Sequence, residues 1–203
     1  IQNTGVEFNL GWNDRISNDL SYGLSFIGTY NKNEVKEMGS ESQAITGGTI
    51  HGGTYTTKTI AGYPIGGFWL IKTDGYFNSV DEVNRHSKDG VLIQPSAEPG
   101  DVRFVDENGN GTIDDGDRVY CGSPFPKFTY AFNANVTYKN FDLSLGFQGV
   151  AGNKIYNATR LQLEDVTRGT NYLASCLDYW TPENQNAAHP RLIWTDPNRN
   201  LRS

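Results

Sequence analysis

The strongest constraint on this chain is a strict alternation of apolar and polar residues in four separate segments. These segments are residues 5–12, 20–30, 128–138 and 141–150. A period of two is typical of β-strands with one apolar face, because successive side chains point to opposite sides of a strand. The polar face holds Ser, Thr, Asn, Gly and Gln, with Glu7 and Asp142 as its only charged residues. Sheets that face bulk water usually carry many Lys and Glu, so this face favours a crowded interior.

Aromatic side chains gather toward the ends of the apolar faces. They are Trp12, Tyr22, Tyr30, Phe128, Tyr138 and Phe141. Each segment has about the 9–11 residues that a tilted strand needs to cross a bilayer, and aromatic girdles mark both interfaces of outer-membrane barrels. The pattern therefore favours a membrane β-barrel. It also fits an antiparallel sandwich or sheet with one buried aromatic face.

The connections between the segments differ sharply in length. Residues 13–19 and 139–140 are compact polar turns, whereas residues 31–127 and 151–203 are long excursions. Outer-membrane barrels have short periplasmic turns and long extracellular loops, while compact soluble domains seldom tolerate such loops. We therefore predict an all-β fold, in which antiparallel strands form part of a large outer-membrane β-barrel and the two excursions are extracellular. Residues 79–86 are expected to form a short helix.

Composition excludes several other classes. The chain has 203 residues, with 17 Lys and Arg against 23 Asp and Glu, and no polybasic stretch, so we expect no nucleic-acid partner. Only two Cys are present, which rules out a disulfide-dense scaffold. The sequence has no apolar run long enough for a transmembrane helix, which leaves a barrel possible. Because it starts at Ile1 inside an alternating pattern, without an initiator Met, we expect a fragment or a processed piece.

Residues 106–117 match the twelve-residue calcium-binding loop. The residues at positions one, three, five, seven, nine and twelve are Asp106, Asn108, Asn110, Thr112, Asp114 and Asp117. Thr112 would bind through its backbone carbonyl, and Gly111 stands at position six, where such a loop turns sharply. Aspartate at position twelve is shorter than the usual glutamate and favours a smaller or weaker site. We predict a structural Ca²⁺ site, with Mg²⁺ as the alternative ion.

The charge of this region agrees with a cation site. Residues 101–118 contain six acidic and two basic residues, so they carry a net −4 of the chain's −6. Such a cluster repels itself unless a cation or Arg neutralises it. The flanking residues do not read as paired EF-hand helices, so we expect a clip in an extracellular loop rather than a sensor. The same residues also fit an Asx-rich turn that binds no ion.

The remaining polar residues give weaker signals. Three histidines, expected to be solvated, lie far apart in polar segments, namely His51, His86 and His189. Cys121 and Cys176 fall in the long excursions, where they either pair in an oxidising exterior or stay as free thiols. No nucleophile motif, paired-carboxylate arrangement or phosphate loop is present, so no catalytic residue is predicted and the chain is not expected to be an enzyme.

Three tryptophans in the long excursions are weak candidates for a ligand site. Trp69, Trp180 and Trp194 could together form a surface on which carbohydrate stacks. Loop tryptophans more often fix a loop to its own base. The ligand-binding residues are therefore not identified by the sequence.

A series of short motifs runs through almost the whole chain. In order, they are Gly5-Val6-Glu7-Phe8, Tyr30-Asn31-Lys32-Asn33-Glu34-Val35, Pro99-Gly100-Asp101, the 106–117 loop with Arg118, Gly122-Ser123-Pro124-Phe125-Pro126-Lys127-Phe128, Phe147-Gln148-Gly149, Gly152-Asn153-Lys154-Ile155-Tyr156-Asn157, Trp180-Thr181-Pro182-Glu183-Asn184 and Pro190-Arg191. This series resembles the C-terminal barrel region of SusC/RagA-type TonB-dependent outer-membrane transporters of Bacteroidetes.

The resemblance implies a 22-stranded barrel with an N-terminal plug. Such a barrel imports glycans or peptides, is energised by the TonB complex, and works with a SusD-type surface lipoprotein over its extracellular mouth. Residues 1–203 would form a partial barrel in contact with outer-membrane lipid, and TonB would act through an N-terminal part that this chain lacks. The alternative reading is a soluble, calcium-stabilised β-domain that binds carbohydrate at the cell surface.

Overall fold

The computed structural model describes residues 1–39, 43–49 and 55–201. The chain divides into two compact units, and each is described by itself. The strand unit comprises Ile1–Thr46, Lys58–Gly67 and Gly122–Ile155, and the loop unit comprises Gly47–Thr57, Phe68–Cys121 and Tyr156–Ser203. Among the described residues, no helix is both long and apolar enough to cross a membrane.

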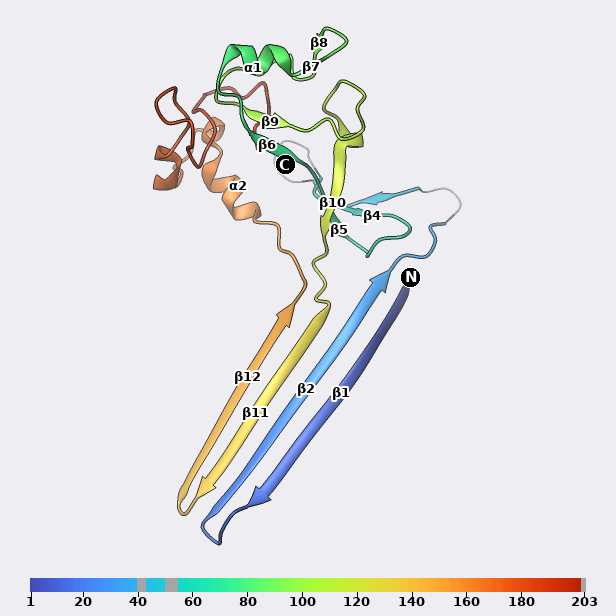
Figure 1. Ribbon diagram of the computed structural model, residues 1–203, viewed down its shortest axis with the longest axis vertical. Coiled ribbons are helices and arrows are strands. Elements are labelled where there is room, and N and C mark those ends of the chain that lie inside the picture. Colours follow the sequence, from blue (N-terminus) through green and yellow to red (C-terminus); the bar gives the residue numbers. More distant parts are fainter. Residues whose placement is uncertain (40–42, 50–54, 202–203) are drawn as a thin grey trace. The chain divides into compact units, whose positions relative to one another are not determined.

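Four long antiparallel strands dominate the strand unit (Figure 1). They are β1 (Gln2–Arg15), β2 (Leu20–Glu34), β11 (Phe128–Tyr138) and β12 (Phe141–Ala151), in the order β1-β2-β11-β12. Each coincides with one of the segments that alternate in the sequence. β1 and β2 extend beyond the predicted 5–12 and 20–30, because the polar residues at their ends continue the pairing without continuing the apolar pattern.

The strand register places like residues side by side across the sheet. Leu10 faces Phe26, Phe26 faces Phe132, and Phe132 faces Phe147, so one row of large apolar side chains crosses the four strands. The next row, on the opposite face, is Gly11, Ser25, Asn133 and Gly146. In that row the Asn133 amide donates to the Ser25 hydroxyl at 3.2 Å. The sheet therefore has one face of large apolar side chains and one face of small, mostly polar side chains.

Large side chains on the apolar face are open to the surroundings. The exposed fractions are 64% for Leu10, 62% for Trp12, 77% for Phe141 and 60% for Phe147. Burying such a side chain contributes about 1.5–3 kcal/mol relative to leaving it in water. Within the described part of the chain, no second layer seals these side chains, so the sheet does not have the covered core of a soluble sandwich.

Aromatic rings on this face lie over glycines of the neighbouring strand. Phe8 pairs with Gly28, and Tyr130 pairs with Gly149. A Cβ atom added at Gly28 would stand 2.3 Å from Phe8 Cζ, and one at Gly149 would stand 2.4 Å from the Tyr130 hydroxyl. The absence of a side chain at each glycine thus lets the adjacent ring lie flat against the sheet.

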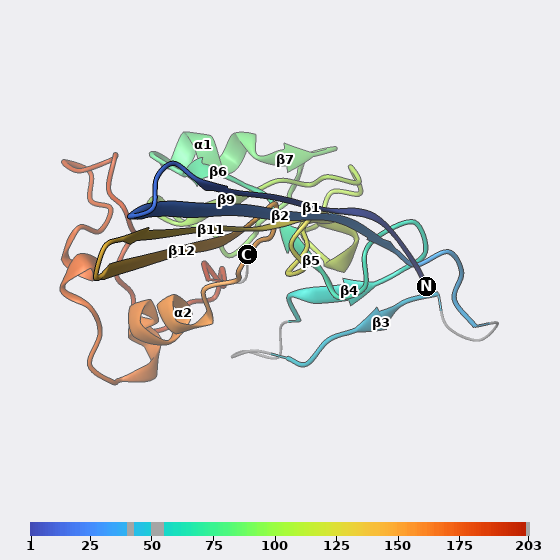
Figure 2. The same ribbon diagram turned by 90° about the horizontal axis from the view of Figure 1, so that it is seen from below.

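Two small features complete the strand unit. β3 (Ile45–Thr46) pairs antiparallel with β4 (Thr57–Thr59), as Figure 2 shows. At the end of β2, buried Val35 exchanges backbone hydrogen bonds with Tyr63 at 2.9 Å and Gly62 at 2.8 Å. These bonds fix the chain after β2 to the 60–67 segment.

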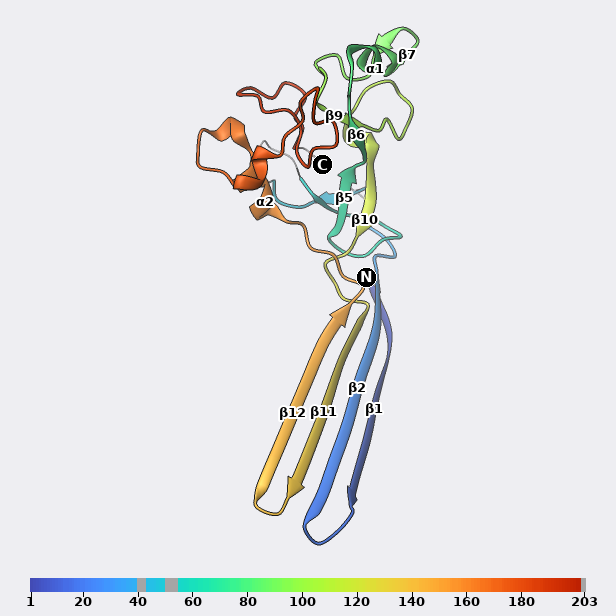
Figure 3. The ribbon, with the colours of Figure 1, turned by 60° about the vertical axis from the view of Figure 1, so that its left-hand side comes forward.

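The loop unit consists of short elements. Its strands are β5 (Gly67–Ile71), β6 (Thr73–Tyr76), β7 (Ser87–Lys88), β8 (Val91–Leu92), β9 (Val102–Phe104) and β10 (Arg118–Gly122). Its helices are α1 (Val80–Arg85), α2 (Ala158–Glu164) and the 3₁₀ turns η2 (Asp115–Asp117), η3 (Val166–Arg168) and η4 (Ala174–Leu177). β5 lies beside β10 (Figure 3), β6 pairs with β9, and β7 pairs with β8. The short helix predicted within 79–86 is confirmed as α1, and Ser79 caps its N-terminus.

Side-chain amides supply hydrogen bonds to β9 that a neighbouring strand would otherwise provide. Gln94 accepts from the Phe104 N–H at 2.8 Å, and Asn200 accepts from the Val102 N–H at 2.7 Å. The Val102 carbonyl accepts from Gln94 and from Asn198, both at 3.0 Å. Because a buried backbone group without a partner is costly, these amides stabilise a strand of only three residues.

Three of the sequence motifs, those that contain Gly100, Trp180 and Arg191, meet in the loop unit at Gly100. Its φ is +89°, and an added Cβ would stand 2.5 Å from the Trp180 ring. The neighbouring Asp101 is fully buried and accepts from Arg191 Nε at 2.7 Å. Trp180 itself donates from Nε1 to Asn78 at 3.0 Å. The Pro-Gly-Asp and Pro-Arg motifs therefore form one packing contact between segments far apart in the sequence.

We predict that Gly100→Ala destabilises this contact by about 3 kcal/mol, because alanine adds backbone strain and a clash with Trp180. The measurement is hydrogen–deuterium exchange of peptides covering 98–104 and 178–191 in the purified native protein. Gly90→Ala is the matched control, since Gly90 also has a positive φ, +80°, but open space around it. Gly90→Ala should lower the local free energy of unfolding by only about 1 kcal/mol. Equal effects of the two substitutions would contradict the assigned packing.

Candidate functional site

The predicted calcium loop lies between β9 and β10 in the loop unit. Its first half curls around Asp106, whose carboxylate accepts from the backbone N–H groups of Asn110 at 3.0 Å and Gly111 at 2.7 Å. Gly111 has a φ of +90°, a conformation that a side chain would strain. Asn108, at position three, accepts from the Asn110 N–H at 2.8 Å. The glycine at position six therefore makes the sharp turn that the motif requires.

The second half of the loop is organised by Asp114 and Asp117. Asp114 caps η2, and the two residues form a reciprocal capping box with their backbone N–H groups. Asp117 is fully buried and also accepts from the Glu107 N–H at 2.9 Å. Positions nine and twelve are thus drawn back over the start of the loop. Asp117 also accepts from the Asn108 N–H at 3.3 Å, so backbone groups use three of the about four acceptor sites of this carboxylate.

The oxygen atoms do not form a closed cage. Asn110 Nδ2 donates to Asp114 at 3.0 Å, while Asn110 Oδ1 accepts from the Thr112 N–H at 2.8 Å and hydroxyl at 2.9 Å. The Asn110 amide must rotate before its oxygen can face an ion beside Asp114. In the part of the chain that the structure describes, no three His, Cys, Asp or Glu side chains are arranged to hold a metal.

The electrostatics of the loop favour its ionised form. Desolvation opposes the charge of Asp106, but hydrogen bonds from the backbone of Gly111, Asn110 and Gly109, together with the Lys88 ammonium, hold the pKa of this carboxyl below its usual value. Lys88 also donates to the Gly109 carbonyl. The Asp106 carboxyl is therefore ionised at neutral pH.

Arg118 connects the end of the calcium loop to its surroundings. Its Nε donates to Asp115 at 2.8 Å and its Nη1 donates to the Trp69 carbonyl at 3.2 Å. The guanidinium also lies 4.5 Å from the centre of the Tyr55 ring, a cation–π contact. The side chain is only 5% exposed. Arg118 thus holds β10, β5 and the Tyr55 segment together.

The three candidate tryptophans do not share one surface. Trp69 and Trp180 are buried, at 8% and 6% exposure, whereas Trp194 is 74% exposed. Trp69 packs against Tyr120 with ring centres 5.9 Å apart. Burial leaves the first two without an open face on which a sugar could stack, and both instead hold the loop unit together.

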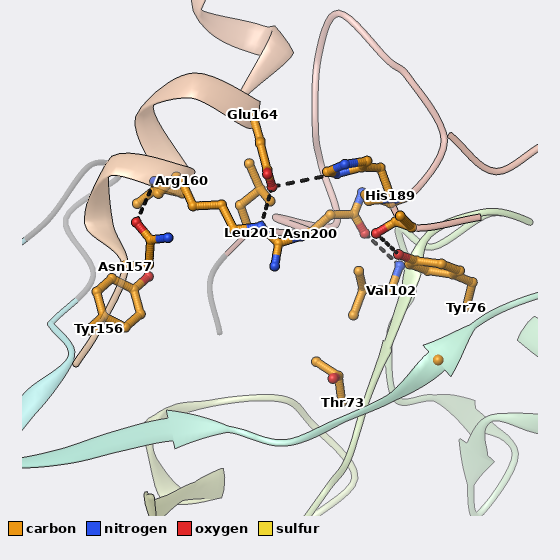
Figure 4. A pocket seen from close by; sticks show the side chains of 14 residues that line it. Thr73, Tyr76, Val102, Tyr156, Asn157, Arg160, Glu164, His189, Asn200 and Leu201 are labelled. Atoms are coloured by element: carbon orange, nitrogen blue, oxygen red, sulfur yellow. Dashed lines mark hydrogen bonds and ion pairs between the residues drawn. The ribbon is translucent and has the colours of Figure 1, made fainter. Parts of the chain in front are cut away.

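A pocket of about 400 Å³ lies in the loop unit beside α2 (Figure 4). Its ionic centre is Glu164, which contacts Arg160 Nε at 2.6 Å and His189 Nδ1 at 3.6 Å. The Tyr76 hydroxyl donates to the Ala188 carbonyl at 3.1 Å. The residues that line the pocket are Thr73, Gly75, Tyr76, Val102, Tyr156, Asn157, Arg160, Leu161, Glu164, Ala188, His189, Pro190, Asn200 and Leu201. Its walls come from β6, β9, α2 and the 188–201 segment, so no local motif predicted it.

The expectation of solvated histidines is wrong for two of the three. His189 is buried, at 6% exposure, beside Glu164. His86 packs edge-on against Phe77 with ring centres 5.4 Å apart, and burial lowers the pKa of this imidazole. His51 lies outside the described residues. The polar neighbours of these histidines in the sequence gave no sign of this packing, because the partners Phe77 and Glu164 lie 9 and 25 positions away.

The cysteines are both free thiols. Cys121 is exposed, whereas Cys176 is buried. Burial raises the pKa of the Cys176 thiol, which leaves it protonated and unreactive at neutral pH.

Known proteins similar to this chain are TonB-dependent receptors. TonB-dependent receptor P26 of Formosa agariphila is 30% identical over 94% of the chain, and receptor P3 of the same organism is 31% identical over 94%. TonB-dependent receptor SusC of Bacteroides thetaiotaomicron is 28% identical over 77%. These alignments cover 19%, 19% and 14% of the relatives' own lengths. No protein-family model matches the chain.

Solved structures show the same fold. A structure of the RagAB peptide transporter aligns with a TM-score of 0.67 at 20% identity, covering 94% of this chain and 20% of that one. The closed-closed state of the RagAB peptide importer aligns with a TM-score of 0.65 at 20% identity, with the same coverage. At this identity the likeness concerns the fold alone.

The relatives named above are receptors and transporters rather than enzymes, in agreement with the prediction that the chain is not an enzyme. The chain spans about a fifth or less of their length. The all-β, antiparallel architecture matches a fragment of such a receptor. Over most of its length, the chain is homologous to a segment of SusC-type TonB-dependent receptors, as its motifs indicated.

Proposed function

We propose that the strand unit forms part of the wall of an outer-membrane importer. In this arrangement the apolar face meets lipid and the polar face lines the lumen. The observation that carries the proposal is the apolar face itself, which runs without interruption across β1, β2, β11 and β12 and is open to the surroundings. TonB-dependent receptors are outer-membrane proteins, which supports the same location.

The dimensions and chemistry of the strands agree with a membrane wall. β11 and β12 have 11 residues each, about the number that a tilted strand needs to cross the hydrocarbon layer. In lipid, side chains such as Leu10 and Phe147 no longer face water, so their exposure carries no hydrophobic penalty. The small groups on the other face leave room for a hydrated lumen.

The exposure of the apolar face does not support the alternative of a soluble β-domain. A soluble carbohydrate-binding β-domain would have to cover the apolar face, whereas Phe141 is 77% exposed and Leu10 is 64% exposed. Exposed apolar faces of this extent mark an interaction with lipid or protein.

We infer the orientation and the partners from the barrel architecture. Short turns belong on the periplasmic side and long loops on the extracellular side, so residues 139–140 would face the periplasm and the loop unit the exterior. Relatives of the SusC and RagAB type support a SusD-like surface lipoprotein as partner and TonB as the energy source. The cargo would be an oligosaccharide or a peptide.

We also propose that residues 106–117 bind Ca²⁺ as a structural ion. Support comes from the match of the twelve-residue motif, from the turn at Gly111 and from the capping box that ties Asp117 back to Asp114. When bound, the ion would neutralise these acids and hold a long segment in one conformation, because it removes loop entropy. The residues that would hold it are Asp106, Asn108, Asn110, Asp114 and Asp117, with the Thr112 carbonyl.

The orientation of the wall predicts a pattern of chemical labelling in the native full-length protein. In a background with Cys121 and Cys176 replaced by Ser, we expect Asp89→Cys to react with a membrane-impermeant maleimide on intact cells. Asn140→Cys should react only after the envelope is opened. Equal labelling of both positions on intact cells would contradict the proposed orientation.

The two faces of β12 provide a matched test of the lipid contact. A fluorophore attached at Leu145→Cys should be quenched by spin-labelled lipid severalfold more than one at Ser144→Cys, because adjacent residues of a strand point to opposite faces. Both measurements use the purified protein in lipid vesicles. Quenching that is stronger at Ser144→Cys would show that the faces are reversed, and no quenching at either position would remove the membrane-wall assignment.

The calcium proposal predicts that Asp117→Asn weakens Ca²⁺ binding at least tenfold, because it removes the charge that closes the loop. Isothermal titration of the full-length protein, with Mg²⁺ as competitor, measures the affinity. Glu107→Gln is the control, since it removes the same charge at a position that does not supply a ligand side chain and should change the affinity less than about twofold. Absence of Ca²⁺ binding in the unmodified protein would overturn the proposal.

A further inference from the structure

The pocket beside α2 has aromatic surfaces at two ends. Figure 4 shows Tyr156 near the start of α2 and Tyr76 on the opposite side, with Glu164 between them along the upper wall. Both rings are partly buried, and burial raises the pKa of each phenol. A tyrosine side chain offers a flat apolar face together with a polar tip, which suits a ligand that is itself flat, apolar on its faces and polar at its edges.

The charges in the pocket balance one another. The Glu164 side chain is 9% exposed and is held by Arg160, and the His189 side chain beside it is 8% exposed. Arg160 donates only its Nε to Glu164, and its side chain is 57% exposed, so its terminal nitrogens are open to a ligand. An anionic ligand on Arg160 would meet the Glu164 carboxylate, and a cationic ligand on Glu164 would meet Arg160. A neutral ligand avoids both repulsions.

The polar groups offer donors and acceptors next to each other. Arg160 supplies N–H donors, and Glu164 supplies carboxylate acceptors. Asn157 accepts from the Arg160 backbone N–H at 3.0 Å through Oδ1, which leaves its amide N–H groups to point elsewhere. Neighbouring hydroxyl groups of a sugar, each both a donor and an acceptor, match such a mixed set. The volume of about 400 Å³ is within the range of small-molecule sites.

We propose that this pocket binds a neutral sugar unit at the end of an oligosaccharide. Tyr156 and Tyr76 contact the faces of the sugar. Arg160, Asn157 and Glu164 bond its hydroxyl groups. The inference rests on the proposed importer function, because it assigns a neutral oligosaccharide rather than a peptide or an acidic glycan as cargo.

The test measures binding to the full-length receptor in detergent. The probes are four neutral hexasaccharides (maltohexaose, cellohexaose, xylohexaose and mannohexaose), a hexamer of galacturonic acid and a neutral hexapeptide. We expect at least one neutral hexasaccharide to bind, and Tyr156→Ala to weaken that binding at least tenfold. Arg160→Gln should weaken it to a similar degree. Tyr156→Phe keeps the ring and should retain the affinity within about threefold.

Tyr172→Ala is the matched control, because it removes an exposed tyrosine side chain of the same unit outside the pocket. It should leave the affinity unchanged. Failure of every neutral probe to bind, or binding that Tyr156→Ala does not alter, would overturn the assignment. If the galacturonic acid hexamer or the hexapeptide bound, and Tyr156→Ala abolished that binding, the assignment of a neutral sugar as ligand would be wrong.

The two proposals can fail separately. Labelling of Asp89→Cys and Asn140→Cys reports the orientation of the protein in the membrane and does not depend on the pocket. Tyr156→Ala should keep that labelling pattern, which shows that the variant folds and inserts. Correct labelling with unaltered sugar binding would remove only the pocket assignment, whereas incorrect labelling would remove the importer orientation.

Discussion

The strand unit is stable only where its apolar face is kept from water. Its four strands satisfy one another's backbone groups, but the side chains on one face, such as Leu10 and Phe147, have no covering layer among the described residues. Hydrogen bonding therefore fixes the register of the sheet, but it does not bury the large apolar side chains on one face. In the membrane wall that we propose, lipid would cover these side chains, and neighbouring strands would pair with the edges at β1 and β12. The membrane would then take the place of a second sheet.

The sequence predicts the long strands well because each has enough residues for a period of two to be recognised. It also predicts the turn of the calcium loop, since every position of that motif lies within twelve residues. The short strands of the loop unit are not predictable in this way. β9 has three residues, and its partners include Asn200. The pairing of Asp101 with Arg191 spans 90 positions, so no window of sequence contains both partners.

Polar contacts, in addition to small apolar clusters, hold the segments of the loop unit together. Asp101 is fully buried and would be costly alone, but it accepts two hydrogen bonds from Arg191 and one from Asn200. Burial opposes the guanidinium charge, yet Asp101 and Glu98 hold the pKa of Arg191 above its usual value. Removal of Arg191 would leave the buried charge of Asp101 without a cationic partner. This gives a physical reason why Pro-Gly-Asp and Pro-Arg occur together.

β9 links the two parts of the loop unit to which we assign ligands. Val102 lines the pocket, and Asp106 opens the calcium loop two residues after Phe104, where β9 ends. An ion that fixes the loop therefore also restricts one wall of the pocket, with Asn200 restraining the same strand from the other side. A wall held in place before the ligand arrives lowers the ordering cost of binding. The calcium ion would then act on cargo affinity through the rigidity of β9, without contacting the cargo.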